Sequence, residues 1–145
     1  MAEIRAVTAK LLDLSGMTFG AQTPSGHSLA LDAAAEHGGE GHGPSPMETL
    51  LVALAGCTGM DVISLLRKMR QNVTGYEVRV SGVQADEHPR IYTSVDVEHV
   101  VTGIGLEAAK VQRAVELSAT RYCPVSATLS GVGTVRHHAT IHSAD

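Results

Sequence analysis

Two cysteines are the residues of this chain best suited to chemistry, because a thiolate is both a nucleophile and a metal ligand. Cys57 and Cys123 stand 66 residues apart, unlike the short paired spacings of a zinc site. Such a pair suits redox chemistry, in which one thiol is oxidised to a sulfenic acid and the other condenses with it. The spacing therefore favours a redox pair over a metal site.

Cys57 lies near the centre of a long predicted helix, residues 45–70. Ser45 and Glu48 match a capping box, in which each side chain reaches a free N–H group of the other residue. No charge occurs between Glu48 and Asp61, so we expect the middle of the helix to be buried on all sides. A thiol there is either a small apolar core residue or a reactive group, and a nearby Asp61 would oppose a thiolate.

Cys123 directly precedes Pro124, and proline is favoured at the first position of a helix. Cys123 would then cap that helix, where free N–H groups and the positive end of the helix dipole lower the pKa of a thiol. Arg121 would add to this effect. The alternative is a plain turn that follows a helix end.

The remaining sequence predicts an α+β fold, with helices against a largely antiparallel sheet, in a single domain over residues 1–145. A second helix is expected over residues 106–122, and the segments 73–83 and 90–101 form a hairpin. Alternating patterns predict further strands over residues 3–12, 18–20, 28–31 and 132–141.

Composition narrows the class of protein. The chain has 145 residues and a net charge of −4, which is no electrostatic footprint for a nucleic acid. The N-terminal sequence does not resemble a signal peptide, and the uncharged stretch around Cys57 is shorter than a bilayer requires. We therefore expect a cytoplasmic protein that binds neither nucleic acid nor membrane.

Histidines offer a second source of metal ligands. Two of them lie with two glutamates in a Gly-rich loop, residues 33–46, and could hold a metal, although solvated loop residues are commoner: Glu36, His37, Glu40 and His42. The neighbours His137 and His138 should face opposite sides of a strand. The last two are expected at ordinary polar positions on or beside the hairpin: His88 and His99.

Two motifs resemble the OsmC/Ohr family, and in particular its OsmC-like (YhfA-type) branch. They are SPMETLLVALAGCTGMDV around Cys57 and, 66 residues after that cysteine, YCPVS around Cys123; the segment 88–93 and the final strand add to the likeness. The resemblance runs from about Ser25 to Ile141. It implies an OsmC-like fold and an intertwined homodimer whose long helices pack together.

The same resemblance implies a thiol-dependent peroxidase that reduces organic hydroperoxides in oxidative stress defence. Cys57 matches the peroxide-attacking cysteine and Cys123 the resolving one. A cellular dithiol would reduce the resulting disulfide. No flavin, haem or metal is required for this reaction.

Two positions depart from the characterised peroxidases, in which an N-terminal arginine pairs with the thiolate. Residues 14–26 contain no Arg or Lys, so the remaining cations are an arginine of a partner subunit or one of this chain: Arg5, Arg90 or Arg121. Those peroxidases also carry a glutamate directly after the helix-opening proline, where this chain has Met47. Glu48 follows one position later and is either catalytic or only a helix cap.

A protein of another class fits the same features. A non-catalytic OsmC-like protein would bind a small hydrophobic ligand at the dimer interface, with the cysteines as packing residues or slow redox sensors. The absent arginine favours this alternative, whereas the pair of cysteines favours the enzyme. A metal-binding protein that uses the loop histidines is a third alternative.

Overall fold

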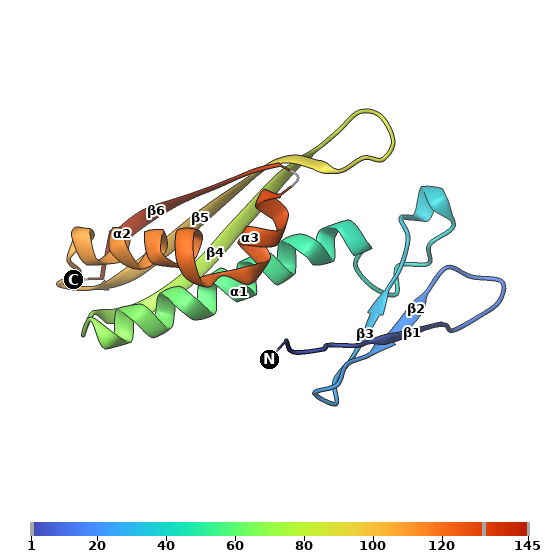
Figure 1. Cartoon of the computed structure of the whole chain (residues 1–145), viewed down its shortest axis with the longest axis horizontal. Helices are drawn as coiled ribbons and strands as arrows, with labels where there is room; N and C mark the ends of the chain where they lie inside the picture. Colours follow the sequence, from blue (N-terminus) through green and yellow to red (C-terminus); the bar gives the residue numbers. More distant parts are fainter. Residues whose placement is uncertain (1, 132, 145) are drawn as a thin grey trace. The chain divides into compact units, whose positions relative to one another are not determined.

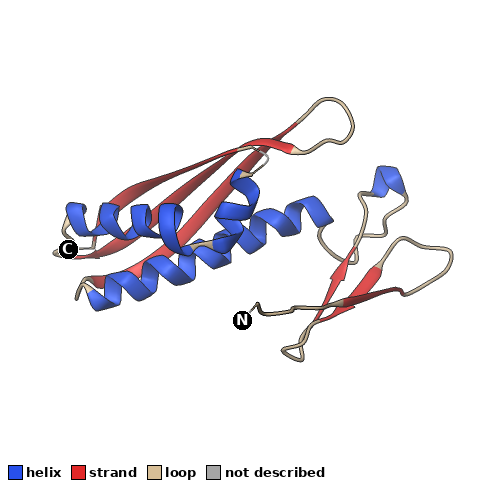
Figure 2. Cartoon of the chain, viewed as in Figure 1, coloured by secondary structure: helices blue, strands red, loops and turns tan. Residues whose placement is uncertain are grey.

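The computed structural model describes residues 2–131 and 133–144, and the chain divides into two compact units, residues 1–50 and 51–145. Three helices and two three-stranded sheets make up the described part, in the mixed α+β arrangement that the sequence predicted (Figure 2). The family-level prediction of the fold class is thereby confirmed.

The first unit contains an antiparallel sheet in the order β1-β2-β3. Its strands are β1 (Thr8–Leu11), β2 (Phe19–Gln22) and β3 (Ser28–Leu31), followed by a short 3₁₀ turn, η1 (Ala35–His37). The predicted first strand over residues 3–12 was too long. Only four of its residues have a partner on β2, and residues 3–7 are exposed.

The long helix α1 (Pro46–Lys68) confirms the predicted helix, but not its burial on all sides. One stripe is buried, with members four residues apart, namely Leu54, Thr58, Val62 and Leu66. Other apolar side chains of α1 are open to solvent, with Val52 65% and Met60 72% exposed. A single chain covers only one face of this helix.

Helix α1 is also, in the part of the chain described, long and apolar enough by length and composition to cross a membrane. Core helices of soluble proteins meet the same criterion.

The second unit is built on the sheet β4-β5-β6, with β4 (Asn72–Gln84), β5 (Tyr92–Ile104) and β6 (Thr134–Ser143). Strands β4 and β5 form the predicted antiparallel hairpin. Strand β6 pairs with β5 in parallel, which alternation alone did not reveal. The predicted start of this strand, Val132, lies outside the described residues.

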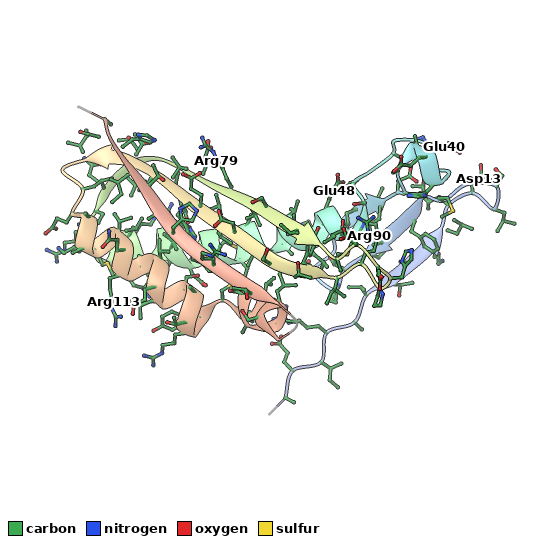
Figure 3. The ribbon with its side chains drawn as sticks, turned by 90° about the horizontal axis from the view of Figure 1, so that it is seen from above. Asp13, Glu40, Glu48, Arg79, Arg90 and Arg113 are labelled. Atoms are coloured by element: carbon green, nitrogen blue, oxygen red, sulfur yellow. The ribbon has the colours of Figure 1, made fainter. Side chains whose placement is uncertain are left out.

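Two helices and a π turn connect β5 to β6 (Figure 1): α2 (Ala108–Leu117), η2 (Ser118–Tyr122) and α3 (Pro124–Ser130). The main core joins α1, α2 and β5 through six buried residues: Val62, Leu66, Val101, Val111, Ala114 and Val115. Several pairs of oppositely charged side chains lie at or near the surface, as with Arg79 beside Glu77 and Glu98, and Arg113 beside Glu116 (Figure 3).

Candidate active site

The two thiols come from the middle of α1 and from the start of α3. Both are free cysteines; Cys57 is half-buried and Cys123 is 3% exposed. Cys123 occupies the N-cap position of α3, with Pro124 as the first helical residue, and its Sγ accepts a hydrogen bond from Ser126 N at 3.3 Å. The predicted capping role of Cys123 is confirmed.

The structure brings Cys57 and Cys123 together across their 66-residue separation, along with Asp61. The two sulfur atoms and a carboxylate oxygen of Asp61 lie within 4.8 Å of one another. Cys57 and Asp61 share one face of α1, since four residues make about one helical turn. The sequence placed this carboxylate only as a group that would oppose a thiolate if it lay close, and it does lie close.

The pKa of Cys123 is raised to about 11, mainly by burial and then by its contact with the Cys57 thiol. The hydrogen bond from Ser126 N acts in the opposite direction but is outweighed. The prediction of a lowered pKa was therefore wrong. Burial disfavours the charged thiolate more strongly than the helix N-terminus favours it.

Asp61 is oriented by a short network of hydroxyl groups. Ser118 Oγ donates to Asp61 Oδ2 at 2.9 Å and shares a 2.7 Å hydrogen bond with Thr58 Oγ1. Ser118 lies on η2, and its carbonyl also accepts from Cys123 N at 2.9 Å. This π turn, a feature often found at functional sites, therefore connects the carboxylate to the cap of α3.

The three arginines considered from the sequence each have another interaction in the described structure. Arg5 pairs with Glu3 at 3.1 Å, and Arg90 Nε donates to the carbonyl of Ala85 at 3.1 Å. Arg121 lies over the ring of Tyr122, 5.4 Å from its centroid. The group that the structure places beside the two thiols is instead the carboxylate of Asp61.

Glu48 forms the capping box that its position predicted. Its carboxylate accepts from Ser45 N at 2.9 Å, while Glu48 N donates to Ser45 Oγ at 3.1 Å. Glu48 is exposed. Helix capping accounts for both of these interactions, and a catalytic role for Glu48 stays a prediction.

A partly buried chain of hydrogen bonds reaches Cys123 from the sheet, and sequence analysis missed it. Tyr76 Oη and His99 Nδ1 are 2.7 Å apart, and His99 Nε2 and His137 Nδ1 are 3.2 Å apart. His137 Nε2 then lies 3.0 Å from Ser126 Oγ. Ser126 is the residue whose N–H reaches Cys123 Sγ.

His99 is fully buried, so the expectation of an ordinary polar position was wrong. Burial lowers its pKa to about 4, and His137 and His138 add to this shift. Burial likewise lowers the pKa of His137. One signal in the sequence could have revealed His99, because it shares the inward face of its strand with Val95 and Val97.

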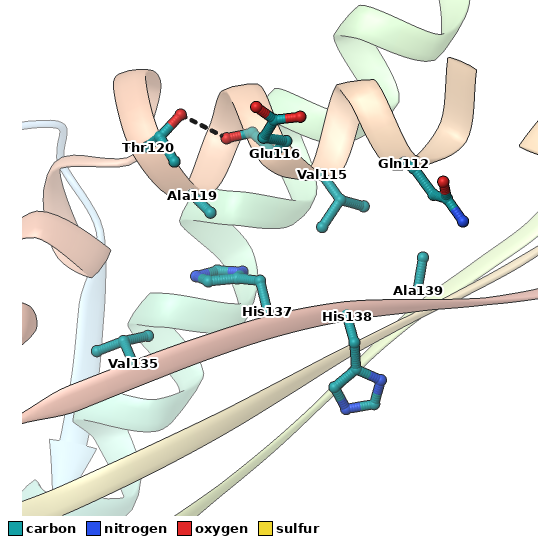
Figure 4. A pocket seen from close by; sticks show the side chains of 9 residues that line it. All are labelled: Gln112, Val115, Glu116, Ala119, Thr120, Val135, His137, His138 and Ala139. Atoms are coloured by element: carbon teal, nitrogen blue, oxygen red, sulfur yellow. Dashed lines mark hydrogen bonds between the residues drawn. The ribbon is translucent and has the colours of Figure 1, made fainter. Parts of the chain in front are cut away.

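His137 and His138 point to opposite sides of β6, as predicted (Figure 4). His138 pairs with Asp96 at 2.8 Å near the surface. His137 lines a cavity of about 360 Å³ between α2 and β6, shown in Figure 4 with the side chains around it.

A second cavity, of about 440 Å³, has Asp61 in its wall. Its lining combines apolar and polar side chains, namely Met60, Asp61, Ser64, Leu65, Lys68 and Tyr122. Asp61 is therefore shared between this cavity and the pair of thiols.

The loop histidines lie in the first unit, beside adjacent acids. His37 is 3.7 Å from Glu36, and His42 is 3.8 Å from Glu40. His42 Nδ1 also lies 3.1 Å from Thr18 Oγ1. Among the described residues, three potential metal ligands converge instead at Cys57, Asp61 and Cys123.

Comparisons with known proteins agree with this architecture. Residues 38–137 match the family model described as OsmC-like protein. The chain is 38% identical to Protein YhfA of Escherichia coli K12 over 130 residues, covering 89% of this chain and 93% of that protein. The protein therefore belongs to the OsmC-like family.

Solved structures share the fold over nearly the whole chain. A hypothetical protein from Aquifex aeolicus VF5 is 28% identical, with a TM-score of 0.84 and coverage of 99% of this chain and 100% of that one. An organic hydroperoxide resistance protein OsmC from Legionella pneumophila is 15% identical, with a TM-score of 0.70 and coverage of 97% and 98%.

Proposed function

We propose that the protein is a thiol-dependent peroxidase that reduces organic hydroperoxides through Cys57 and Cys123. The observation that carries this proposal is the approach of two free sulfur atoms to within 4.8 Å. Modest side-chain movement brings such a pair to the roughly 2.05 Å of a disulfide. Membership of the OsmC-like family, and the fold shared with a hydroperoxide resistance protein, support the same function.

The difference in exposure supports distinct roles for the two cysteines. Cys57 is half-buried, whereas Cys123 is 3% exposed, so a peroxide reaches Cys57 more easily. Cys57 is accordingly the attacking residue and Cys123 the resolving residue.

In the first step, the Cys57 thiolate attacks the terminal oxygen of the hydroperoxide. The O–O bond breaks, the alkoxide takes up a proton and leaves as an alcohol, and Cys57 becomes a sulfenic acid. The cavity of about 440 Å³ beside Asp61 would hold the organic part of the substrate against Met60, Leu65 and Tyr122.

In the second step, the Cys123 sulfur attacks the Cys57 sulfur, and the hydroxyl group leaves as water. Cys123 must give up its proton, which the raised pKa of this thiol opposes. Asp61 lies within 4.8 Å of both sulfur atoms and would carry this proton to the departing hydroxyl, directly or through one water molecule. A dithiol then reduces the disulfide by exchange.

We further propose that the protein acts as a homodimer in the cytoplasm. The exposed apolar residues of α1, such as Val52 and Met60, require a cover, and a second copy of this helix would supply one. Permanent interfaces of this kind bury more than about 2,000 Å². Sedimentation at micromolar concentration is expected to show a dimer, and a stable folded monomer would contradict it.

The test of the enzymatic function is steady-state reduction of cumene or tert-butyl hydroperoxide with a lipoyl or simple dithiol reductant. Peroxide alone should remove both free thiols and reduce the subunit mass by two hydrogen atoms. Loss of a single thiol, as a sulfinic acid, would show that Cys123 does not resolve the intermediate.

A non-catalytic binding protein is the second candidate, and the carboxylate of Asp61 favours it. The group within 4.8 Å of both sulfur atoms is a carboxylate, whereas the characterised peroxidases place an arginine beside the reactive thiol. This candidate predicts saturable binding of a small apolar ligand without hydroperoxide turnover.

A further inference from the structure

We propose that Cys57, Asp61 and Cys123 form a zinc-binding site in the reduced protein. Zinc binding does not depend on the peroxidase activity proposed above. It also goes against the spacing of the cysteines in the sequence, which lacks the short pairs typical of zinc sites.

The distances among the three donor atoms fit one tetrahedral ion after small side-chain rotations. The two sulfur atoms and the carboxylate oxygen lie within 4.8 Å of one another. Ligand atoms around zinc are separated by roughly 3.5–3.8 Å, given bonds of about 2.3 Å to sulfur and about 2.0–2.2 Å to oxygen. Each donor therefore needs to move by about 1 Å or less.

Regular secondary structure holds these donors in place. Cys57 and Asp61 lie one turn apart on α1, and Cys123 is the N-cap of α3. Sites on helices are more precisely ordered than sites on loops. The two elements thus present three ligands of the kinds that zinc accepts, thiolate and carboxylate.

Hydrogen bonds from outer residues already orient two of the three ligands. Ser118 Oγ donates to Asp61 at 2.9 Å, and Ser126 N donates to Cys123 Sγ at 3.3 Å. Such outer partners fix ligand geometry in metal sites. The hydrogen bonds from Ser118 and Ser126 also favour cation binding, because each stabilises the negatively charged form of its ligand.

Charge also favours a divalent cation at this position. Two thiolates and one carboxylate would repel one another strongly if they stood together without a positive partner. Zinc would compensate this charge and hold both cysteines as thiolates.

The site has a free position and a route of entry. Three protein ligands leave a fourth tetrahedral position for a water molecule. Asp61 lines the cavity of about 440 Å³, and Cys57 is half-exposed. An ion can therefore reach the donors without unfolding of the chain.

Zinc binding and disulfide formation exclude each other, because both use the same two sulfur atoms. When an organic hydroperoxide oxidises the zinc-bound dithiolate, two electrons pass from sulfur to the peroxide bond. The disulfide, free Zn²⁺ and an alcohol form, and two protons complete one water molecule. Zinc would thus bind only to the reduced state of the protein.

The test is titration of the reduced, chelator-treated protein with Zn²⁺ and with Co²⁺. We expect one zinc ion per chain, and a cobalt complex with a thiolate charge-transfer band in the near ultraviolet and the intense visible bands of a tetrahedral site. Cys57→Ser, Cys123→Ser and Asp61→Asn should each weaken zinc binding by more than about a hundredfold. Ser118→Ala should weaken it about tenfold to a hundredfold, as expected for an outer partner.

Two controls separate this site from other metal-binding groups. Asp86→Asn changes an exposed carboxylate of the β4–β5 connection and should leave the zinc affinity unchanged. A His37→Ala/His42→Ala variant should also bind zinc normally. Binding that survives both cysteine substitutions, or that disappears with the two loop histidines, would overturn the proposal, as would the absence of stoichiometric binding.

Discussion

The network around Asp61 and the network around His99 both reach Cys123, but they differ in charge and in access to solvent. Ser118 connects Asp61 to the backbone of Cys123, and Asp61 itself lines an open cavity. In the second network, His99 is fully buried, and His137 lies within hydrogen-bond distance of both His99 and Ser126.

Burial explains the difference between the two networks. Asp61 lines a cavity that water and ligands can enter, so its carboxylate is suited to moving a proton or binding a cation. Burial holds His99 neutral, with a pKa of about 4. A neutral, fully bonded chain of rings and hydroxyl groups is suited to fixing geometry, here the N–H group that faces Cys123 Sγ.

The largest effect should follow from removing the sulfur of Cys57, the proposed attacking residue. Cys57→Ser is expected to abolish hydroperoxide reduction, because the remaining thiol, Cys123, is only 3% exposed. Cys123→Ser should retain the first step but form no disulfide within the chain, so that Cys57 is left as a sulfenic acid. Mass spectrometry of the treated proteins distinguishes the two, since excess peroxide should convert Cys57 of the second variant to sulfinic acid.

Substitutions in the network around His99 should lower the stability of the fold rather than the peroxidase activity. His99→Phe would leave Tyr76 Oη and His137 Nδ1 without their partner in a buried setting. We expect a loss of about 2–4 kcal/mol in the free energy of unfolding, measured with urea. The matched control is His138→Phe, which removes an exposed hydrogen bond to Asp96 and should cost less than about 1 kcal/mol. Equal losses in the two variants would contradict the structural role of His99.

The pH dependence of stability should carry the signature of His99. The unfolded chain binds a proton at this residue near pH 6.5, whereas the folded chain does so only near pH 4. The unfolded state thus gains protons first, and stability falls as the pH decreases through this window. Between pH 7 and pH 5 the loss should be about 2 kcal/mol.

His99→Gln serves as the control for this measurement, because glutamine does not titrate. The variant should be less stable at pH 7 and should lose correspondingly less stability between pH 7 and pH 5. An unchanged pH dependence would show that other groups are responsible.

The smallest effect concerns the electrostatic coupling of the two networks. Burial raises the pKa of Tyr76, and the negative charge of Asp61 raises it further. Asp61→Asn should therefore lower the pKa of this tyrosine, as followed by ultraviolet absorption of tyrosinate. Tyr76→Phe identifies the signal, because it removes the contribution of this tyrosine from the spectrum. No change in the tyrosine titration would mean that the networks act independently.

Local interactions are the part of this structure that the sequence predicted well. The capping box of Ser45 and Glu48 involves residues three apart, so its formation depends little on the rest of the chain. The same holds for Cys123 and Pro124 at the start of α3, and for the alternation that marks β4 and β5. The two cysteine motifs, finally, were enough to indicate the OsmC-like family.

Packing decided what local sequence could not. The helix N-terminus at Cys123 predicted a lowered pKa, but burial and the Cys57 thiol reverse the sign. The parallel pairing of β6 with β5 depends on the path of the chain through α2 and α3, which lie between these two strands.

The sequence by itself determined the helices, the hairpin and the presence of two thiols that are capable of redox chemistry. Only the tertiary structure placed Asp61 beside both sulfur atoms and joined His99 to Cys123 through His137 and Ser126. The physical reason is that charge, hydrogen bonding and burial at a site depend on neighbours from distant segments. Residue type and local spacing do not specify those neighbours, because the neighbours are set by how the whole core packs.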